Sequence, residues 1–327
     1  MQLIKKDLLA FDDVWLVPQY NELASRSIPN LSSTLSPTVK LDTPIIASNM
    51  STVVNSTMAR TLERHGSLAI MHRFLEENAL LNLADCEAQT MKYFAFSVGI
   101  KNEDLETAKK MHDKLSDKAI ILVDIAHGHS LQMGKFVTKI KNVGYHTVIA
   151  GNVATKEGYD FLCDHGADAV RVGVAGGSAC TTKYVTGHHI PTLTSVMLCA
   201  NRNNRKPIIA DGGIRNSGDA VKCLAAGASF VCLGSVLAST SDAPGDIISK
   251  DGEKFKEYYG MSSQKAIDTY FKDAKKHVAP EGKVLHLPYT GETDVFLKNF
   301  IAGIKSGLTY SGAENIQQFQ QKAQLYY

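Results

Sequence analysis

A glycine-rich loop that carries one cysteine is the part of this sequence best suited to covalent chemistry. Residues 173–183 read Gly-Val-Ala-Gly-Gly-Ser-Ala-Cys-Thr-Thr-Lys, so Cys180 lies among small and hydroxyl-bearing residues. Glycines allow backbone N–H groups to turn toward an anion, and Ser178 adds a hydroxyl. A cysteine in such a polar loop is suited to be a nucleophile if the loop lies at the active-site edge of the fold. The remaining cysteines lie in helical or strand patterns and are predicted to be small buried hydrophobes: Cys86, Cys163, Cys199, Cys223 and Cys232.

Two shorter glycine-containing segments indicate a phosphate site. Residues 211–214 read Asp-Gly-Gly-Ile, and residues 234–235 read Gly-Ser. Each follows an apolar run that resembles a buried strand, and loops after the last two strands of an α/β barrel often bind phosphate. We therefore expect both segments to hold one phosphate, which leaves Asp211 to bind ribose hydroxyls.

Eight short apolar runs alternate with helical segments and would position these loops. The runs lack polar alternation, which is typical of parallel strands buried on both faces. They cover residues 44–49, 67–72, 94–99, 119–126, 147–152, 169–173, 207–213 and 230–238. Eight β–α units with short connections predict an α/β protein of the closed (β/α)₈ TIM-barrel class. An open doubly wound sheet usually has a glycine-rich fingerprint after its first strand, and Asn-Met-Ser-Thr stands there instead.

Polar residues end the predicted strands. In a parallel barrel the carboxyl ends of all strands meet at one rim, where the active site is built. These residues are Asn49, His72, Ser97, Asp124, Asn152, the loop leading to Cys180, Asp211 and Ser235. We expect them to converge on one site.

The length and composition fit one barrel. The chain has 327 residues, of which 44% are hydrophobic, enough for a single large core. We predict one domain over residues 1–327, with an N-terminal extension at 1–43, a barrel core at about 44–245, and an active-site flap and C-terminal segment at about 246–327.

Charge and targeting signals favour a small-molecule enzyme of the cytosol. The formal net charge is only +2, and no basic face indicates nucleic-acid binding. No apolar run is long enough to span a membrane, and the N-terminus lacks signal-peptide character. The cysteines show no CxxC spacing, so a disulfide framework or a zinc site is not expected. His127 and His129 have no evident third ligand, so no metal site is predicted.

Taken together, the motifs resemble the inosine monophosphate dehydrogenase and GMP reductase family over essentially the whole chain. The matching segments are residues 11–18 (Phe-Asp-Asp-Val-Trp-Leu-Val-Pro), 49–52 (Asn-Met-Ser-Thr), 124–130 (Asp-Ile-Ala-His-Gly-His-Ser), 150–153 (Ala-Gly-Asn-Val), 177–182 (Gly-Ser-Ala-Cys-Thr-Thr), 211–214, 258–263 (Tyr-Tyr-Gly-Met-Ser-Ser) and 281–283 (Glu-Gly-Lys). In this order and combination they are highly specific.

The resemblance implies roles for individual residues. Cys180 would attack C2 of a purine nucleotide and form a thioimidate intermediate. The substrate-binding residues would be Ser178, Asp211, Gly212, Gly213, Gly234, Ser235, Tyr258, Met261 and Ser262, with Glu281 near the base. The cofactor-binding residues would be Asp124, Ala126, His127 and Asn152. The family also implies a homotetramer.

The two branches of the family differ after the adduct forms. The dehydrogenase branch uses NAD and hydrolyses the adduct with a flap arginine, but residues 264–280 contain no arginine. The reductase branch has a threonine and a glutamate where Thr182 and Glu281 stand. A hydroxyl backed by a carboxylate can deliver the proton that ammonia needs to leave. The resemblance therefore implies NADPH-dependent reductive deamination of GMP to IMP, a step of purine nucleotide salvage, with Cys180, Thr182 and Glu281 as catalytic residues.

Three positions depart from the family pattern. Ala175 replaces a glycine whose carbonyl helps to bind a monovalent cation in the dehydrogenases, which argues against a K⁺ requirement. Ser51 stands where the family usually has aspartate, and Arg73 where some reductases have lysine. A modified or deoxy guanine nucleotide therefore remains an alternative substrate. An NAD-dependent inosine monophosphate dehydrogenase and a non-catalytic purine-nucleotide sensor remain alternative functions.

Overall fold

Eight parallel strands close into a barrel in the computed structural model, which describes residues 8–87, 89–200, 206–270 and 279–327. The strands pair in the order β10-β11-β4-β5-β6-β7-β8-β9, and the β4–β11 pairing closes the ring. Their bounds are β4 Ile45–Ala47, β5 Leu68–Met71, β6 Phe94–Val98, β7 Ala119–Asp124, β8 Thr147–Val153, β9 Ala169–Val172, β10 Ile208–Asp211 and β11 Phe230–Leu233. The TIM-barrel prediction is confirmed.

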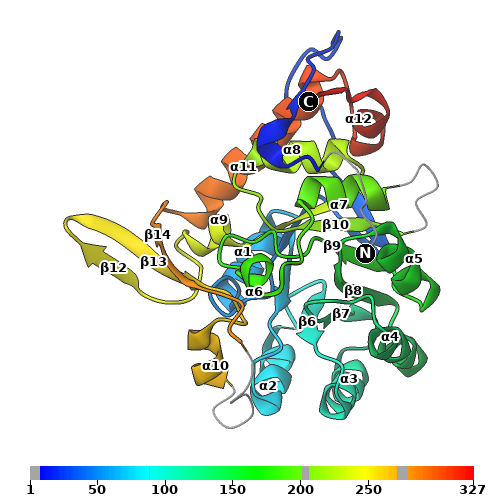
Figure 1. Ribbon diagram of the computed structural model, residues 1–327, viewed down its shortest axis with the longest axis vertical. Helices are drawn as coiled ribbons and strands as arrows, with labels where there is room; N and C mark the ends of the chain where they lie inside the picture. Colours follow the sequence, from blue (N-terminus) through cyan, green and yellow to red (C-terminus); the bar gives the residue numbers. More distant parts are fainter. Residues whose placement is uncertain (1–7, 88, 201–205, 271–278) are drawn as a thin grey trace.

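Helices lie outside the strands, as Figure 1 shows for α3, α4 and α5 beside β6, β7 and β8. Side chains of Asn55, Ser130, Thr155 and Asn216 accept hydrogen bonds from the first turns of α1, α4, α5 and α8, the usual way in which a helix start is stabilised. The bounds are α1 Ser56–Arg64, α2 Glu77–Glu87, α3 Asn102–Leu115, α4 Leu131–Val143, α5 Lys156–Asp164, α6 Thr182–Thr186, α7 Thr192–Cys199 and α8 Ser217–Ala225, with the short 3₁₀ helix η2 at Ser116–Lys118.

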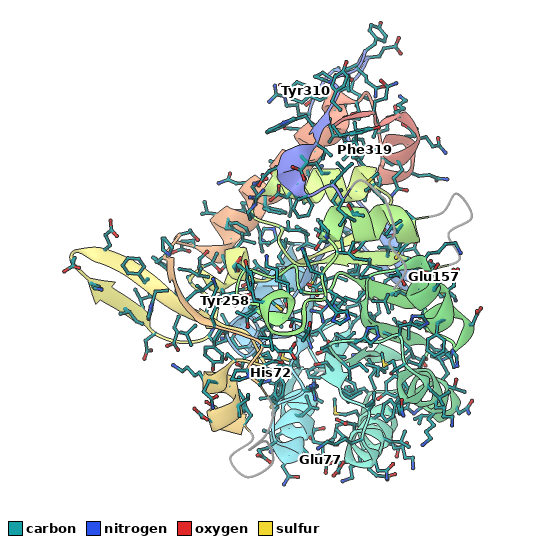
Figure 2. All side chains as sticks on the ribbon, viewed as in Figure 1. His72, Glu77, Glu157, Tyr258, Tyr310 and Phe319 are labelled. Atoms are coloured by element: carbon teal, nitrogen blue, oxygen red, sulfur yellow. The ribbon has the colours of Figure 1, made fainter. Side chains whose placement is uncertain are left out.

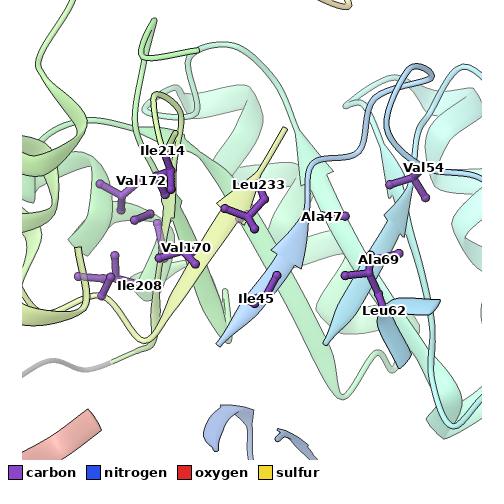
Figure 3. Packing of buried hydrophobic residues seen from close by; sticks show 14 of the residues in the cluster. Ile45, Ala47, Val54, Leu62, Ala69, Val170, Val172, Ile208, Ile214 and Leu233 are labelled. Atoms are coloured by element: carbon purple, nitrogen blue, oxygen red, sulfur yellow. The ribbon is translucent and has the colours of Figure 1, made fainter. Parts of the chain in front are cut away.

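The two faces of the strands build two separate cores. Outward-facing side chains pack against the helices, as Figure 3 shows for Ile45 and Ala69 near Leu62 of α1. Alternate, inward-facing side chains such as Ile46 and Leu122 form a second cluster inside the barrel. Because side chains alternate along a strand, the next inward positions toward the carboxyl ends carry polar rim residues such as Ser97, Asp124 and Asp211.

A hairpin closes the amino-terminal end of the barrel. It consists of β2 Ser33–Ser36 and β3 Val39–Leu41, which pair antiparallel. Leu35, Val39 and Leu41 pack into the interior cluster. The segment predicted as an N-terminal extension therefore contains the floor of the barrel. Before it lie η1 Phe11–Asp13 and β1 Trp15–Leu16, and β1 pairs with the C-terminal β15 Leu325–Tyr326.

A three-stranded antiparallel sheet projects from one side of the barrel (Figure 1). It contains β12 Ile247–Lys250, β13 Glu253–Tyr259 and β14 Val284–Pro288. The chain between β13 and β14 forms α10 Gln264–Tyr270, and part of the predicted flap, residues 271–278, lies outside the described residues, as do residues 1–7. The C-terminal helices are α11 Thr293–Tyr310 and α12 Ile316–Lys322.

Two local expectations were wrong. The last predicted strand, at 230–238, ends at Leu233, and Ser235–Ala238 form the short helix α9, because Gly234 breaks the extended run with φ −110 and ψ −91. Cys86 is exposed on α2, whereas the other four cysteines expected in the core are buried. Within the described ranges, no helix has the length and apolarity to cross a bilayer.

Candidate active site

One cavity of about 270 Å³ opens at the carboxyl ends of the barrel strands and against the projecting sheet. It is lined by every catalytic and substrate-binding residue that the sequence predicted, namely Cys180, Thr182, Glu281, Ser178, Asp211, Gly212, Gly213, Gly234, Ser235, Tyr258, Met261 and Ser262. Of the predicted cofactor residues, Asp124, Ala126 and Asn152 line it and His127 does not. The barrel therefore brings together loops that are far apart in the sequence.

A chain of hydrogen bonds leads from the cysteine to a carboxylate. The thiol of Cys180 donates to Thr182 Oγ1 at 3.2 Å, and the hydroxyl of Thr182 donates to Glu281 Oε2 at 2.6 Å. Cys180 is partly buried, and its sulfur reaches the cavity. Because each donor faces an acceptor, a proton can leave the sulfur and reach Glu281 without a histidine.

Backbone hydrogen bonds hold the cysteine loop, the loop at Ser262 and the segment at Glu281 next to one another. Thr181 N–H donates to Glu281 O at 3.0 Å, Glu281 N–H to Ser262 O at 2.9 Å, and Lys283 N–H to Ala179 O at 2.9 Å. A Cβ at Gly260 would lie 3.2 Å from Ala179 O, so glycine lets the base-side loop approach the cysteine loop without crowding.

The Asp-Gly-Gly segment after β10 lies against the glycines of the cysteine loop. Gly212 and Gly213 have φ of +99 and +78, a region that favours glycine. A Cβ at Gly212 would lie 3.0 Å from Gly176 C, and one at Gly213 would lie 3.0 Å from Gly176 O. The two glycine-containing loops thus meet backbone to backbone, an arrangement in which backbone N–H groups can bind an anion.

Tyr258 closes the same region from β13. Figure 2 shows it near the centre of the view, and a Cβ at Gly234 would lie only 3.0 Å from its hydroxyl oxygen. Burial, together with the negative charge of Asp211, raises the pKa of the Tyr258 phenol above its ordinary value. The hydroxyl therefore stays protonated and can donate to an anion beside Gly234 and Ser235.

A buried arginine organises the rim, and sequence reasoning missed it. Arg171 lies in β9 and pairs with Asp211 at 3.0 Å and with Asp124 at 3.4 Å. It also donates to Asn49 Oδ1 at 2.6 Å. Burial disfavours its charge, but Asp211 and Asp124 outweigh this, so the pKa of Arg171 is raised. A lone charge within an apolar strand, two residues after inward-facing Ala169, was the signal that could have revealed it.

A second cysteine lines the cavity without the surroundings of a nucleophile. Cys232 is buried at the end of β11. Burial, and next the carboxylate of Asp211, raise the pKa of its thiol. A protonated thiol is a poor nucleophile, which separates Cys232 from Cys180.

The cofactor side of the cavity combines fixed acceptors with one unsatisfied donor. Asn152 Nδ2 donates to Asp211 Oδ2 at 2.6 Å, and Asn49 Nδ2 donates to Asp124 Oδ2 at 3.0 Å. Arg73 also lines the cavity, and its buried Nε is without a hydrogen-bond partner among the described residues. Such a donor fits a polar ligand at this end of the site.

His127 lies apart from this arrangement. It is exposed, and its ring packs edge-on against His129 with 6.4 Å between ring centroids. Ala126 is the last residue of this loop that lines the cavity, and neither histidine lines it. No group of three or more histidine, cysteine or acidic side chains suited to a metal occurs in the portion of the chain that the structure describes.

Of the three departures from the family pattern, Ala175 and Arg73 line the cavity, and Ser51 contacts one of its lining residues. Ala175 adopts φ +61, a left-handed conformation that an alanine rarely takes. Ser51 donates to Met261 Sδ at 3.5 Å. The replaced aspartate position therefore contacts a residue expected to bind the base.

Comparisons with known proteins agree over nearly the entire chain. The family model described as "IMP dehydrogenase / GMP reductase domain" matches residues 8–327. GMP reductase 2 of Mus musculus is 34% identical over 321 residues, which cover 96% of this chain and 92% of that protein. Inosine-5'-monophosphate dehydrogenase of Nitrosopumilus maritimus is 30% identical, with 98% of this chain and 95% of that protein covered.

A solved structure is similar as well. A cysteine-to-alanine variant of GMP reductase from Trypanosoma brucei, in complex with guanosine 5'-monophosphate, superposes with a TM-score of 0.88 at 25% identity. The match covers 98% of this chain and 95% of that one. Since the family model spans almost the whole sequence and both relatives are at least 30% identical, this chain belongs to the IMP dehydrogenase / GMP reductase family.

Proposed function

We propose that this protein is an enzyme that reduces GMP to IMP with release of ammonia, using NADPH. The observation that carries the proposal is the hydrogen-bonded chain from Cys180 through Thr182 to Glu281. It supplies a nucleophile and a path for the proton that the leaving amino group requires. The GMP reductases of Mus musculus and Ascaris suum, similar over 96% of this chain, support the same activity.

The first step forms a covalent adduct. The thiol proton moves through Thr182 to Glu281, and the Cys180 sulfur forms a bond to C2 of the purine. The C2–N bond breaks, and the amino group takes the proton back along the same path and leaves as ammonia. A thioimidate between Cys180 and C2 remains.

The second step releases IMP. NADPH, when bound, supplies the hydride that reduces C2. The C–S bond then breaks, and the sulfur leaves as a thiolate. Because the original thiol proton left with ammonia, Glu281 takes one proton from solvent and passes it through Thr182 to the sulfur. Thr182 and Glu281 thus act in both halves of the reaction.

The remaining pocket residues hold the two ligands. Ser178, Gly213, Gly234, Ser235 and Tyr258 surround the expected 5′-phosphate position. Gly212 contributes to the same cradle, Asp211 holds the ribose, and Met261 and Ser262 contact the base.

The nicotinamide end fits the opposite part of the cavity. Asp124, Ala126 and Asn152 border it, and the unpartnered Nε of Arg73 offers a donor there. Position 175 gives no support to a K⁺ site, because it carries an alanine, held in a strained left-handed conformation, where the family pattern has glycine.

The dehydrogenase reaction is disfavoured by the sequence of the flap. Hydrolysis of the adduct would need a base that activates water, and no arginine follows Arg215 in the chain. Because one relative, at 30% identity, is a dehydrogenase, the dehydrogenase reaction is the second activity to be assayed.

The decisive assay follows the absorbance of the reduced nicotinamide with GMP and NADPH. Wild type should oxidise NADPH and release ammonia in equal amounts, and Cys180→Ala should do neither. Cys86→Ala is the matched control, because Cys86 is exposed on α2, away from the cavity. NADH formation from IMP and NAD would instead favour the dehydrogenase. Tight GMP binding without turnover would favour the nucleotide sensor.

We also propose a homotetramer located in the cytosol. Exposed aromatic side chains around the paired chain ends support self-association: Trp15, Tyr20, Tyr310 and Tyr326. All six cysteines are free, which suits a reducing compartment. Light scattering on the purified protein would measure the assembly size.

A further inference from the structure

The loop that is expected to bind phosphate has little rigidity of its own. Gly212 and Gly213 follow one another at positive φ, and glycine has the widest range of backbone conformations. Their positions must therefore be fixed by what packs around them. On one side lies Gly176 of the cysteine loop, which is itself in a glycine-rich segment.

The other side is held by the N-terminal segment. A Cβ at Gly213 would lie 3.6 Å from the ring of Phe11, which is buried in η1. In Figure 1 this first, blue segment lies beside α8. Lys222 of α8 donates to Phe11 O at 2.8 Å, and Leu9 exchanges two hydrogen bonds with Thr194 at 2.7 and 2.9 Å.

An ion-pair clamp fixes the chain directly after the glycines. Arg215 donates through Nη1 and Nη2 to both carboxylate oxygens of Asp12, at 2.9 and 2.6 Å. Its Nε and its backbone N–H both donate to Asp219 Oδ2 at 3.0 Å. Asp219 is only 2% exposed in the first turn of α8. We name these three residues, Asp12, Arg215 and Asp219, the Arg215 clamp.

The clamp joins three elements at one point. Asp12 belongs to η1, Asp219 to α8, and Arg215 lies two residues after Gly213. The planar guanidinium makes two parallel bonds to Asp12, a geometry that restricts direction as well as distance. The hydrogen bond from Arg215 also holds the pKa of the Asp12 carboxyl below its usual value, so the pair stays charged near neutral pH.

We propose that the Arg215 clamp is a positioning device that holds the Gly212–Gly213 turn in the conformation that binds the 5′-phosphate of the nucleotide. This rests on the proposed nucleotide substrate and adds a role for residues of the N-terminal segment, far in sequence from the site. The clamp residues do not touch the reacting atoms. Their loss should weaken phosphate recognition and leave the chemical step intact.

The test compares Asp12→Asn with a matched variant elsewhere. Asp294 at the start of α11 also pairs with an exposed arginine, Arg64, at 3.1 Å, so Asp294→Asn removes a similar carboxylate away from the cavity. Asp12→Asn should raise the KM and Kd for GMP by about fivefold, the upper end for one exposed ion pair, with kcat unchanged. Asp294→Asn should leave both constants at wild-type values.

Binding of guanosine distinguishes a specific loss of phosphate recognition from a general disturbance of the site. Guanosine lacks the phosphate, so Asp12→Asn should not weaken guanosine binding measured by calorimetry. An equal loss for GMP and guanosine, or an equal effect of Asp12→Asn and Asp294→Asn, would overturn the proposal.

A double-mutant cycle checks that the pair acts as one unit. Arg215→Gln, which also loses the side-chain bond to Asp219, should weaken GMP binding at least as much as Asp12→Asn, and the double variant should be no worse than Arg215→Gln alone. Additive losses would contradict the clamp. If wild type binds GMP but does not reduce it, the proposed function fails while these binding measurements still decide the role of the clamp.

Discussion

The thiol of Cys180 donates a 3.2 Å hydrogen bond to the hydroxyl of Thr182. Because that hydroxyl accepts from sulfur, its own proton points onward, and Glu281 receives it at 2.6 Å. The thiol proton and the hydroxyl proton therefore both point toward Glu281. In the proposed mechanism, activation of the nucleophile and protonation of the leaving group therefore use the same two side chains in opposite directions.

Replacing Thr182 with valine should separate these roles from binding. Thr182→Val keeps the shape of the side chain but removes the hydroxyl, so kcat with GMP should fall by about 10²–10⁴-fold, the usual contribution of general acid–base catalysis. The GMP dissociation constant should change little. Steady-state kinetics and calorimetry measure both quantities.

The neighbouring threonine provides the control. Thr181 meets Glu281 through its backbone N–H, so Thr181→Val should keep most of the activity. A Thr181→Val enzyme as slow as Thr182→Val would show that local packing, and not the hydroxyl, limits the reaction.

Arg171 should matter more for stability than any surface ion pair. Its side chain is 9% exposed and faces Asp124 and Asp211. Arg171→Met would leave two partly buried carboxylates without their cation, which typically costs roughly 3–5 kcal/mol of unfolding free energy. Urea denaturation of the wild type and of Arg171→Met measures this difference in unfolding free energy. Arg64→Ala, at an exposed pair, should cost no more than about 1 kcal/mol.

The left-handed conformation of Ala175 predicts a stabilising substitution. An alanine at φ +61 carries a steric penalty that glycine avoids. Ala175→Gly should therefore raise the unfolding free energy by about 1 kcal/mol. Ala323→Gly, at φ −57, should instead lower it, because glycine there only adds freedom to the unfolded chain. The midpoint temperature of thermal unfolding should rise in Ala175→Gly and fall in Ala323→Gly.

His72 should make the protein sensitive to mild acid. Burial lowers the pKa of this histidine from 6.5 to about 4, so the unfolded chain binds its proton more readily than the folded one. The associated stability is complete above pH 6.5 and is lost as the pH falls toward 4, by roughly 3 kcal/mol in total.

Asparagine at position 72 isolates this contribution. His72 Nδ1 accepts from Phe74 N–H at 3.3 Å, and an asparagine oxygen can replace that acceptor. His72→Asn should flatten the stability curve between pH 6.5 and 4, measured by urea unfolding at each pH. His146→Asn, at an exposed histidine, should leave the slope as in wild type. An unchanged slope in His72→Asn would contradict the prediction.

The barrel was predictable because its signals are local. Each strand is a short apolar run, and side chains such as Asn55 and Thr155 mark where helices begin. The end of the last strand was misjudged because Val236, Leu237 and Ala238 resume the apolar run after Gly234 and Ser235. Only the backbone turn at Gly234 separates the two elements.

The site was predictable where motifs carry it and missed where pairing across the barrel carries it. Cys180, Thr182 and Glu281 stand in recognisable segments, and the structure brings them together. Arg171 is meaningful only once Asp124 and Asp211 are known to face it. His127 was assigned to the cofactor site by the family resemblance; it does not line the cavity, and its role there stays a prediction.

The backbone ladder between the cysteine loop and residues 281–283 limits how this enzyme can diversify. Glu281 is bonded through its own main chain to Thr181 on one side and to Ser262 on the other. A shift that reshapes the proposed base pocket around Ser262 therefore also displaces the carboxylate that is proposed to move the proton. Substrate preference and reaction rate are therefore coupled through these backbone hydrogen bonds. A variant selected for a new purine should at first have a lower kcat, and further substitutions in the hydrogen-bonded segments should be needed to restore it.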